Sequence, residues 1–309
     1  MTDHQRVIAV VVTWNRKRLL AESLRAVQEQ TCPPAEVVVV DNASTDGTAD
    51  LLGAEFPDVR VVRTTANTGG AGGFALGIAS ALELNCDALW LMDDDTIPEP
   101  TALEALLAAR SGYPGEPPVL VASRVVWTDG SDHPMNTPRT KPGLRESERR
   151  DAASVSCIAI RSASFVSVLV DAAAVLERGL PLADYFLWND DFEFTTRLIR
   201  DRRAVLCPAS VVVHKTATFG SIDADPGERF FYEVRNKVWL FGRSRGLSPV
   251  EKSVYAGSTL LRWVRTLASS DHPSTLWRAL GRGLVAGIRS GPRSTPEVLA
   301  NAVREGRHD

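Results

Sequence analysis

The first half of the chain alternates buried, strand-like runs with helix-like stretches four times. The runs RVIAVVVTW, AEVVVVDNAS, VRVVRT and DALWLM are apolar and largely β-branched, as strands covered on both faces are. The stretches between them, such as NRKRLLAESLRAVQEQT, carry apolar residues at helical spacing. This alternation predicts an α/β protein with a parallel sheet, right-handed crossovers and flanking helices.

The later sequence predicts further strands and a helical end. VLVASRVVW favours a strand, SCIAIRSASFVSVLVDAAAVLERG a strand and then a helix, and AVLCPASVVVHKT a pair of strands. Residues 128–153 are polar and rich in Pro and Gly, and we expect a long flexible loop there. Residues 228–309 favour helices, with breaks near Pro249, Pro273 and Pro292.

Charge is distributed unevenly along the chain. Residues 235–309 contain 13 Lys and Arg against 5 Asp and Glu, a net charge of +8, whereas the remainder has a net charge of −11. An acidic body with a basic end predicts a polyanionic or membrane-surface partner for that end. The overall charge of −3 gives no indication of a nucleic-acid partner.

Cysteine usage and the N-terminus bear on the compartment. The four cysteines are scattered and form no CxxC pair, which argues against a disulfide framework or a zinc site. The N-terminus lacks a basic stretch followed by an apolar segment and a cleavage site, and no run of about 18 apolar residues occurs. We expect a cytoplasmic protein, either soluble or peripheral on the cytoplasmic face of the membrane.

Three consecutive acids, Asp93, Asp94 and Asp95, follow the fourth apolar run. Like charges this close destabilise a fold unless a positive group lies among them. Open α/β sheets bind ligands beyond the carboxyl ends of their strands. In an extended segment there, Asp93 and Asp95 would point to the same side and share a divalent cation. A solvated acidic turn is the alternative.

Two earlier segments also carry candidate groups at strand ends. Asp41 ends VVVVD and can accept a hydrogen bond from a base or ribose. Alternatively, Asp41 or Ser44 caps the predicted helix Thr48–Glu55, with Gly47 in a turn. NTGGAGGF, residues 67–74, is expected to be a glycine-rich loop whose backbone amides approach a ligand. It lacks the GxGxxG order, and GxxxxGK[ST] does not occur, so dinucleotide and P-loop sites are not favoured.

Two candidates lie in the second half. WNDDFE, residues 188–193, places three acids beside aromatic residues at a predicted helix start. Acids in a first turn stabilise the helix dipole, but a carboxylate near apolar walls also gains proton affinity, which suits a general base. His214 ends SVVVH, where a lone histidine is usually structural. It would complete a carboxylate metal site if the fold brought it close to Asp95.

Taken in order, VVVTWNR, VVVVDNASTDGT, NTGGAGGF, DDD, WNDDFE and the late histidine resemble the inverting family 2 glycosyltransferases with the GT-A fold. The resemblance implies a Rossmann-like, mixed and mostly parallel sheet with flanking helices. NxGGAGGF before WLxDDD is similar to actinobacterial galactofuranosyltransferases of cell-wall galactan and to related rhamnosyltransferases of lipid-linked glycans. We expect a glycosyltransferase domain at residues 1–240 and a basic helical C-terminal region at 241–309.

The resemblance also implies site residues. Those expected to bind the nucleotide sugar are Thr13, Trp14, Asn15, Arg16, Asp41, Asn67, Gly69, Gly70, Gly72, Gly73, Asp93 and Asp94. A divalent cation, Mn²⁺ or Mg²⁺, would be held by Asp93, Asp95 and His214. Asp191 is the expected base, or Asp190 if the motif frame slips by one residue. The residues expected at the acceptor are Trp188, Asp190 and Glu193.

The reaction implied is transfer of a sugar, with galactofuranose favoured, from a nucleotide diphosphate sugar such as a UDP sugar to a hydroxyl of a glycan acceptor linked to polyprenyl diphosphate. Rhamnosyl transfer from a thymidine nucleotide sugar is the first alternative. A nucleotidyltransferase and a non-catalytic sugar-nucleotide-binding module are more distant ones. Residues 241–309 would contact the membrane or form a homo-oligomer interface.

Overall fold

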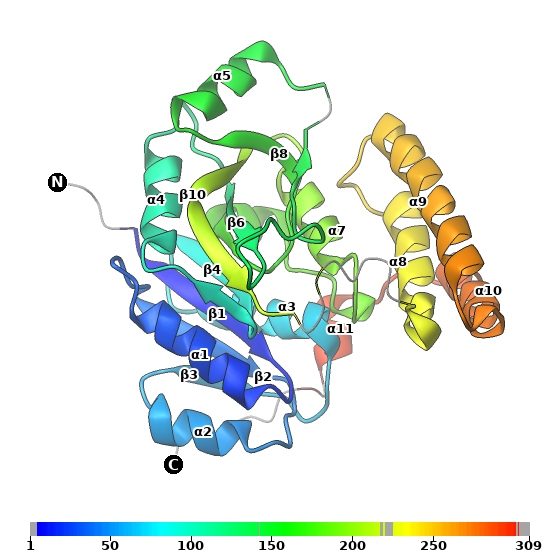
Figure 1. Ribbon diagram of the computed structural model, residues 1–309, viewed down its shortest axis with the longest axis horizontal. Helices are drawn as coiled ribbons and strands as arrows, with labels where there is room; N and C mark the ends of the chain where they lie inside the picture. Colours follow the sequence, from blue (N-terminus) through cyan, green and yellow to red (C-terminus); the bar gives the residue numbers. More distant parts are fainter. Residues whose placement is uncertain (1–4, 142, 217–218, 220–224, 301, 303–309) are drawn as a thin grey trace.

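The computed structural model describes residues 5–141, 143–216, 219, 225–300 and 302. Over these residues the chain forms one ten-stranded sheet in the order β3-β2-β1-β4-β9-β6-β10-β8-β7, with β5 paired to β10 (Figure 1). The predicted mixed α/β sheet with flanking helices is therefore confirmed.

Parallel pairing is concentrated in the first half of the sheet. The parallel strands there are β1 (Val7–Thr13), β2 (Glu36–Asp41), β3 (Arg60–Arg63) and β4 (Ala88–Asp93). The remaining strands are β5 (Thr96–Pro98), β6 (Leu120–Val126), β7 (Arg139–Thr140), β8 (Ile158–Ser162), β9 (Val168–Asp171) and β10 (Ala204–His214). Strand β9 runs antiparallel between β4 and β6, whereas β6 and β10 are parallel.

Helices cover both faces of this sheet, which explains the continuous apolar runs. Alternate residues of β1 pack on opposite faces, Ala9 on one and Val10 on the other. The first face is covered by α1 (Lys17–Gln28), α2 (Thr48–Glu55) and α4 (Ala102–Ser111). The second is covered by α3 (Gly69–Leu82), α6 (Ala172–Arg178) and α7 (Asp190–Leu198). A strand with apolar packing on both faces needs no polar alternation.

The last part of the chain is helical, as predicted. Its elements are η3 (Gly227–Arg229), α8 (Phe230–Gly242), α9 (Pro249–Ser269), α10 (Pro273–Arg289) and α11 (Thr295–Leu299), and the short helix η1 (Ala183–Tyr185) lies earlier, before α7. Pro249 and Pro273 each occupy the first position of a helix, where a missing N–H costs no hydrogen bond. Among the described residues, none of the helices has the length and apolar character needed to cross a bilayer.

The C-terminal region does not pack as one unit. Helices α8, α9 and α10 share a small core around Phe230, Val234 and Trp263, at one side of the molecule (Figure 1). Helix α11 instead returns to α3, where Leu299 and Ala302 are buried against Ala75. Residue 240, where the boundary was expected, lies within α8, and α11 is attached to the sheet region through α3.

Two local expectations are wrong. Residues 128–153 are not one loop, because they contain β7 and α5 (Glu146–Ser154). The polar composition conceals α5 since its buried face includes Glu148, which is paired with Lys141 at 2.6 Å. AVLCPASVVVHKT forms a single strand, β10, with a bulge between Cys207 and Val211, rather than two strands.

Candidate functional site

A cavity of about 1060 Å³ lies beyond the carboxyl ends of β4 and β10. Its walls come from the start of α3, the segment 134–140, the segment 187–191 before and within α7, and helices α8 and α9. Of the acids and the histidine predicted from the sequence, four line this cavity, namely Asp93, Asp190, Asp191 and His214. The fold thus gathers groups from distant parts of the chain around one space.

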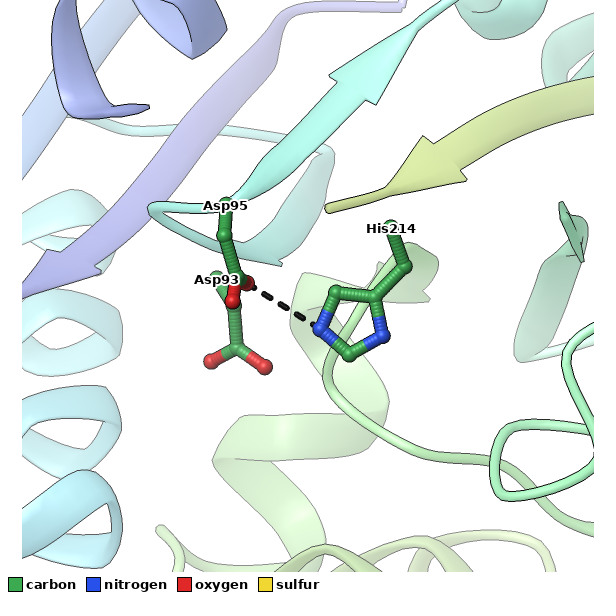
Figure 2. A group of neighbouring side chains, drawn as sticks. All are labelled: Asp93, Asp95 and His214. Carbon is green, nitrogen blue, oxygen red and sulfur yellow. Dashed lines mark ion pairs between the residues drawn. The ribbon is translucent and has the colours of Figure 1, made fainter. Parts of the chain in front are cut away.

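Asp93, Asp95 and His214 form a cluster at one end of the cavity (Figure 2). One ligand atom from each lies within 4.8 Å of the others. Asp93 ends β4, but Asp95 lies in a turn, so the expectation that an extended segment aligns the two acids is wrong. Strand β5 pairs with β10 and sets Thr96 opposite His214, which brings Asp95 to the histidine.

Asp94, the middle acid, faces away from that cluster and organises the loop after β1. Its Oδ2 accepts a hydrogen bond of 2.7 Å from the Thr13 hydroxyl, and its Oδ1 lies 3.4 Å from the Arg16 guanidinium. Burial raises the pKa of Asp94 to about 6, although Thr13 and Arg16 favour the charged form. Arg16 also pairs with Asp95 at 2.5 Å, so one cation already offsets part of the acidic charge.

The remaining charge in the cluster is unevenly distributed. Burial and the adjacent charge of Asp95 raise the pKa of Asp93 to about 7. Burial also disfavours the charge on Asp95, but contact with His214 and Arg16 outweighs it and lowers the pKa of Asp95. For His214, burial opposes protonation, yet the two acids raise its pKa. A further cation would therefore stabilise ionised Asp93.

The donor atoms of this cluster fit a divalent metal ion. Asp95 Oδ1 and His214 Nε2 are 3.1 Å apart, but Asp95 Oδ1 is buried without a hydrogen bond. His214 Nδ1 lies 2.9 Å from Asn136 Oδ1 and donates to it, which leaves Nε2 directed at the acids. Two carboxylates and one imidazole suit Mn²⁺ or Mg²⁺.

Four predicted nucleotide-binding residues, Thr13 to Arg16, follow β1 directly. Trp14 is half exposed, with 51% of its surface accessible. Asn15 has a positive φ of 53°, and its side-chain oxygen accepts a hydrogen bond of 2.7 Å from the backbone of Thr45. This contact joins the loop after β1 to the loop after β2, so both strand ends present a single edge to a ligand.

Asp41 is fully buried at the end of β2 and only partly satisfied. Its Oδ1 accepts a hydrogen bond of 2.9 Å from the backbone of Ser44, within the turn after β2. The capping alternative is wrong, because Gly47 is the N-cap residue of α2 and no side chain caps that helix. Its Oδ2 has no hydrogen bond, although Arg63 Nε lies 3.3 Å away. A buried carboxylate oxygen without a donor is costly, and a ligand N–H would satisfy it.

The glycine-rich segment is helical, so the expectation of a loop is wrong. Helix α3 begins at Gly69, and Asn67 Oδ1 accepts a hydrogen bond of 2.8 Å from its amide. A Cβ on Gly73 would lie 2.4 Å from Val12, and one on Gly72 would lie 2.5 Å from Thr68, so these two glycines allow close packing. Gly70 has open space beside it and lines the cavity.

The segment before α7 is held in an unusual backbone conformation. Phe186, Trp188 and Asn189 all have positive φ, between 62° and 66°. Asn236 on α8 is fully buried, and its amide lies within 2.9 Å of the carbonyls of Tyr185, Leu187 and Trp188. These contacts offset the strain and direct Trp188 and the two acids after it into the cavity.

The three acids of WNDDFE have different surroundings. Burial raises the pKa of Asp190 well above its usual range, and the charges of Asp191 and Asp93 add to the effect. Burial also raises the pKa of Asp191, but the backbone amide of Phe192 and the charge of Lys237 counter it. Glu193 pairs with Arg197 at 2.9 Å and accepts a hydrogen bond from Ser244, and it does not line the cavity. Its placement favours a structural role over the predicted acceptor contact.

Sequence patterns did not indicate Asn136, Asn236 or Lys237. Asn136 lies in a segment that the sequence suggested only as a loop. Asn236 and Lys237 are buried within the apolar helix FFYEVRNKVWLFG. The one available signal was a pair of polar residues on the apolar side of a helix, because such groups require partners.

Comparison with known proteins agrees with this geometry. The family model described as glycosyl transferase family 2 matches residues 8–158. Galactofuranosyltransferase GlfT1 of Mycobacterium tuberculosis is 32% identical over 305 residues, which cover 90% of this chain and 96% of the relative. The GlfT1 of Mycolicibacterium smegmatis is 43% identical over 109 residues, which cover 35% of this chain and 36% of that protein.

More distant proteins are similar in part or in fold. An N-acetylglucosaminyl-diphospho-decaprenol L-rhamnosyltransferase of M. tuberculosis is 34% identical over 37% of this chain and 39% of its own length. The structure of S. aureus TarS 1-349 with UDP-GlcNAc has a TM-score of 0.62 at 16% identity, covering 96% of this chain and 83% of that one.

The mannosyltransferase PcManGT of Pyrobaculum calidifontis, in complex with GDP-Man and Mn²⁺, has a TM-score of 0.54 at 20% identity. The alignment covers 97% of this chain and 79% of that one. These similarities in sequence and fold confirm the resemblance predicted from the sequence. The chain belongs to glycosyl transferase family 2 and is a glycosyltransferase with the GT-A fold.

Proposed function

We propose that this glycosyltransferase moves galactofuranose from a UDP sugar to a hydroxyl of a polyprenyl-diphosphate-linked glycan, with inversion at the anomeric carbon. The observation that carries the proposal is the shared cavity, which is lined by Asp93 and His214 of the metal-binding cluster and by the acid pair of α7. Such an arrangement supports a bound donor at one end and a base for the acceptor at the other.

The relatives favour this donor over the alternatives. The similarity to the galactofuranosyltransferase extends over nearly the whole chain, whereas that to the rhamnosyltransferase covers little more than a third. The name of the rhamnosyltransferase specifies a diphospho-decaprenol acceptor, which supports a lipid-linked acceptor here. Membership of the family disfavours a nucleotidyltransferase, and two intact acid pairs disfavour a module that only binds.

Asp191 is the better candidate for the base. A general base must lose its proton near neutral pH while keeping a raised pKa. Asp190 faces Asp191 and Asp93 and retains its proton more strongly, whereas Lys237 and a backbone amide favour ionised Asp191. Asp191 would take the proton of the acceptor hydroxyl as that oxygen attacks the anomeric carbon and the bond to the nucleotide diphosphate breaks on the opposite face.

Asp93, Asp95 and His214 would hold the divalent cation, Mn²⁺ or Mg²⁺. A bound divalent cation supplies Lewis-acid stabilisation of the departing diphosphate. Asn136 orients His214, and Arg16 keeps Asp95 ionised. The unsatisfied oxygen of Asp41 would accept a hydrogen bond from the pyrimidine ring, and Gly70 leaves room for the sugar beside α3.

Calorimetric titration with UDP and with dTDP, each in Mn²⁺ and in EDTA, tests the donor assignment. We expect UDP to bind more tightly than dTDP, and to lose at least about tenfold in affinity in EDTA or in Asp95→Asn. Tighter binding of dTDP would favour the rhamnosyl alternative. If neither nucleotide bound, the proposed function would be wrong.

The outer face of α9 and α10 supports a peripheral membrane contact. Val250, Val254, Leu261 and Val264 are between 63% and 74% exposed and share one side of α9. Trp277 and Ile288 on α10 are 60% and 69% exposed, and the arginines of both helices add positive charge. An apolar stripe with basic residues suits an anionic membrane surface.

Co-sedimentation with phosphatidylglycerol vesicles tests this contact. The double variant L261D/V264D should lose vesicle binding, whereas Leu176→Asp, at a site 70% exposed on α6, should not. Deletion of the whole region is a poorer test because α11 packs on α3. Unchanged binding by the double variant, with dissociation of a dimer in light scattering, would assign the face to self-association.

A further inference from the structure

The end of the cavity away from the acid cluster is lined by cations. Arg139 lies over two aromatic rings, 5.7 Å from the centroid of Phe192 and 5.3 Å from that of Tyr255. Arg262 on α9 pairs with Glu233 at 2.6 Å. Lys237, one turn after Glu233 on α8, lies 5.0 Å from the ring of Phe192. Of these side chains, Arg139, Arg262, Glu233 and Tyr255 line the cavity.

Lys237 is a buried cation whose ammonium group lies against two aromatic rings, 5.0 Å from the centroid of Phe192 and 5.8 Å from that of Phe241. Only 6% of its surface is exposed, and within the described part of the chain no hydrogen bond or ion pair reaches its ammonium group. Burial, together with the charges of Arg262 and Arg139, lowers the pKa of Lys237 to about 8, although Glu233 and Asp191 favour its charged form. A buried charge without a hydrogen-bonding partner destabilises the fold.

The charges in this group do not balance. Glu233 is paired with Arg262 and also accepts hydrogen bonds from Asn189 and Trp263, so its oxygens are already engaged. Arg139 instead lies over aromatic rings, and Lys237 lies close enough to Asp191 to favour its ionised form. Positive groups gathered at a cavity are the counterpart of the acids at its other end, and they would be stabilised by a bound anion.

We propose that Arg139, Lys237 and Arg262 bind the diphosphate ester of the acceptor. The inference rests on the proposed function and adds to it a place for the acceptor's anionic group. Tyr255, Trp263 and Thr266 continue the cavity wall along α9. The exposed apolar stripe lies on the same helix, on the side away from the cavity.

The geometry separates this site from that of the donor diphosphate. The donor's phosphates belong with the cation held by Asp93, Asp95 and His214. Asp190 and Asp191 line the same cavity, and Asp190 lies close enough to Asp93, and Asp191 to Lys237, for their charges to interact. A base placed between a donor anion and an acceptor anion can reach a hydroxyl on the sugar that joins them.

Binding of dodecyl diphosphate to the full chain in EDTA, compared with the neutral dodecyl maltoside, tests the proposal. Arg139→Gln and Lys237→Met should each weaken binding of the diphosphate about tenfold or more, as loss of a charged hydrogen bond does, and leave the maltoside unchanged. Arg150→Gln, an exposed position on α5, is the matched control and should bind as wild type does. Arg139 is exposed as well, so its variant is expected to fold even if that of Lys237 does not.

Two further measurements, of UDP binding and of vesicle binding, show whether the cations bind the acceptor diphosphate, the donor diphosphate or a lipid headgroup. UDP with Mn²⁺ should bind Arg139→Gln as tightly as wild type, and it should not displace dodecyl diphosphate. Displacement by UDP would assign the cations to the donor and overturn the proposal, as would equal diphosphate affinity in wild type and Arg139→Gln. Vesicle binding that fell in Arg139→Gln as much as in L261D/V264D would indicate a lipid headgroup instead. Failure of UDP to bind wild type would count against the proposed function alone.

Discussion

The two ends of the cavity have opposite charge and different origins in the chain. The acidic end is built from strand ends, with Asp93 on β4 and His214 on β10, and its acids are adjacent in the sequence. The basic end is built from β7, α8 and α9, and brings together Arg139, Lys237 and Arg262. The central sheet fixes the first end, whereas the second depends on helix packing. The acidic end can therefore be recognised in the sequence as a motif, whereas the basic end cannot.

The same contrast extends to how each end is supported. At the acidic end, Thr13, Arg16 and Asn136 fix the carboxylates and the imidazole through hydrogen bonds. At the basic end, aromatic rings lie against Arg139 and Lys237, whereas Arg262 pairs with Glu233. A preorganised end suits a metal and a rigid diphosphate, and a less constrained end suits varied glycan acceptors.

The largest expected effect lies between the two ends. Asp191→Asn should lower the turnover number by about 10²–10⁴-fold, the range for loss of a general base, while the affinity for UDP with Mn²⁺ stays unchanged. Single-turnover assays and calorimetry measure the two quantities. Asp190→Asn is the companion variant, and its turnover number should fall less than that of Asp191→Asn. Wild-type turnover in Asp191→Asn would transfer the role of base to Asp190.

Two glycines of α3 have different roles at the donor end: one allows close packing on the sheet, and the other lies beside the space for the ligand. Gly73→Ala should lower the free energy of unfolding by about 1–3 kcal/mol, because its Cβ would overlap Val12 in the core. Gly70→Ala, beside open space on the same helix, should leave stability within about 1 kcal/mol of wild type but affect ligand affinity. Chemical denaturation measures both. Equal stability of the two variants would contradict the close packing of α3 on β1.

Asn136→Ala tests how strongly the acidic end is preorganised. Without the amide oxygen, His214 loses the hydrogen bond that fixes its ring, and Mn²⁺ affinity should fall about 10–100-fold. Electron paramagnetic resonance of free Mn²⁺ gives the affinity without any assay of transfer. Ser164→Ala removes only the other hydrogen bond of Asn136 and should bind the metal as wild type does. If Asn136→Ala also bound as wild type does, the imidazole would need no such support.

The smallest expected effect is the pH dependence of the basic end. The pKa of Lys237 lies near 8 in the folded chain, below its usual value, so the buried charge is present at lower pH and is lost as pH rises. Stability should therefore rise with pH above about 8, as the folded state releases its proton before the unfolded state does. Affinity for dodecyl diphosphate should fall over the same range, by up to about tenfold for each pH unit.

Measuring the affinity for dodecyl diphosphate between about pH 7 and pH 9 gives this pH dependence. A lysine with the usual pKa stays charged throughout that range, so it would produce no such dependence. Lys237→Met should bind more weakly and show little dependence on pH. Glu233, Asp191, Arg139 and Arg262 face the same space. Of these, Asp191 has a pKa raised by burial, so a slope retained in the variant would assign the titration to Asp191.

Much of the donor end could be predicted from the sequence, because the pattern there is local. Apolar runs define β1 to β4, and a parallel sheet places their carboxyl ends at one edge. The acids Asp93 and Asp95 and the family follow from that order. The residues 188–193 were also located, but the direction of each side chain was not: Asp190 and Asp191 line the cavity, and Glu193 is paired with Arg197.

The sequence by itself determined the α/β class, the family and the position of the acidic edge, since strand and helix periodicity and adjacent motifs depend on near neighbours. Only the tertiary structure decided that Asp95 meets His214 through β5, that Gly72 and Gly73 serve packing, and that α11 returns to α3. It also decided which cations gather beside Asp191. Contacts such as these join residues far apart in the chain, and side-chain direction there follows from packing, which no short pattern encodes.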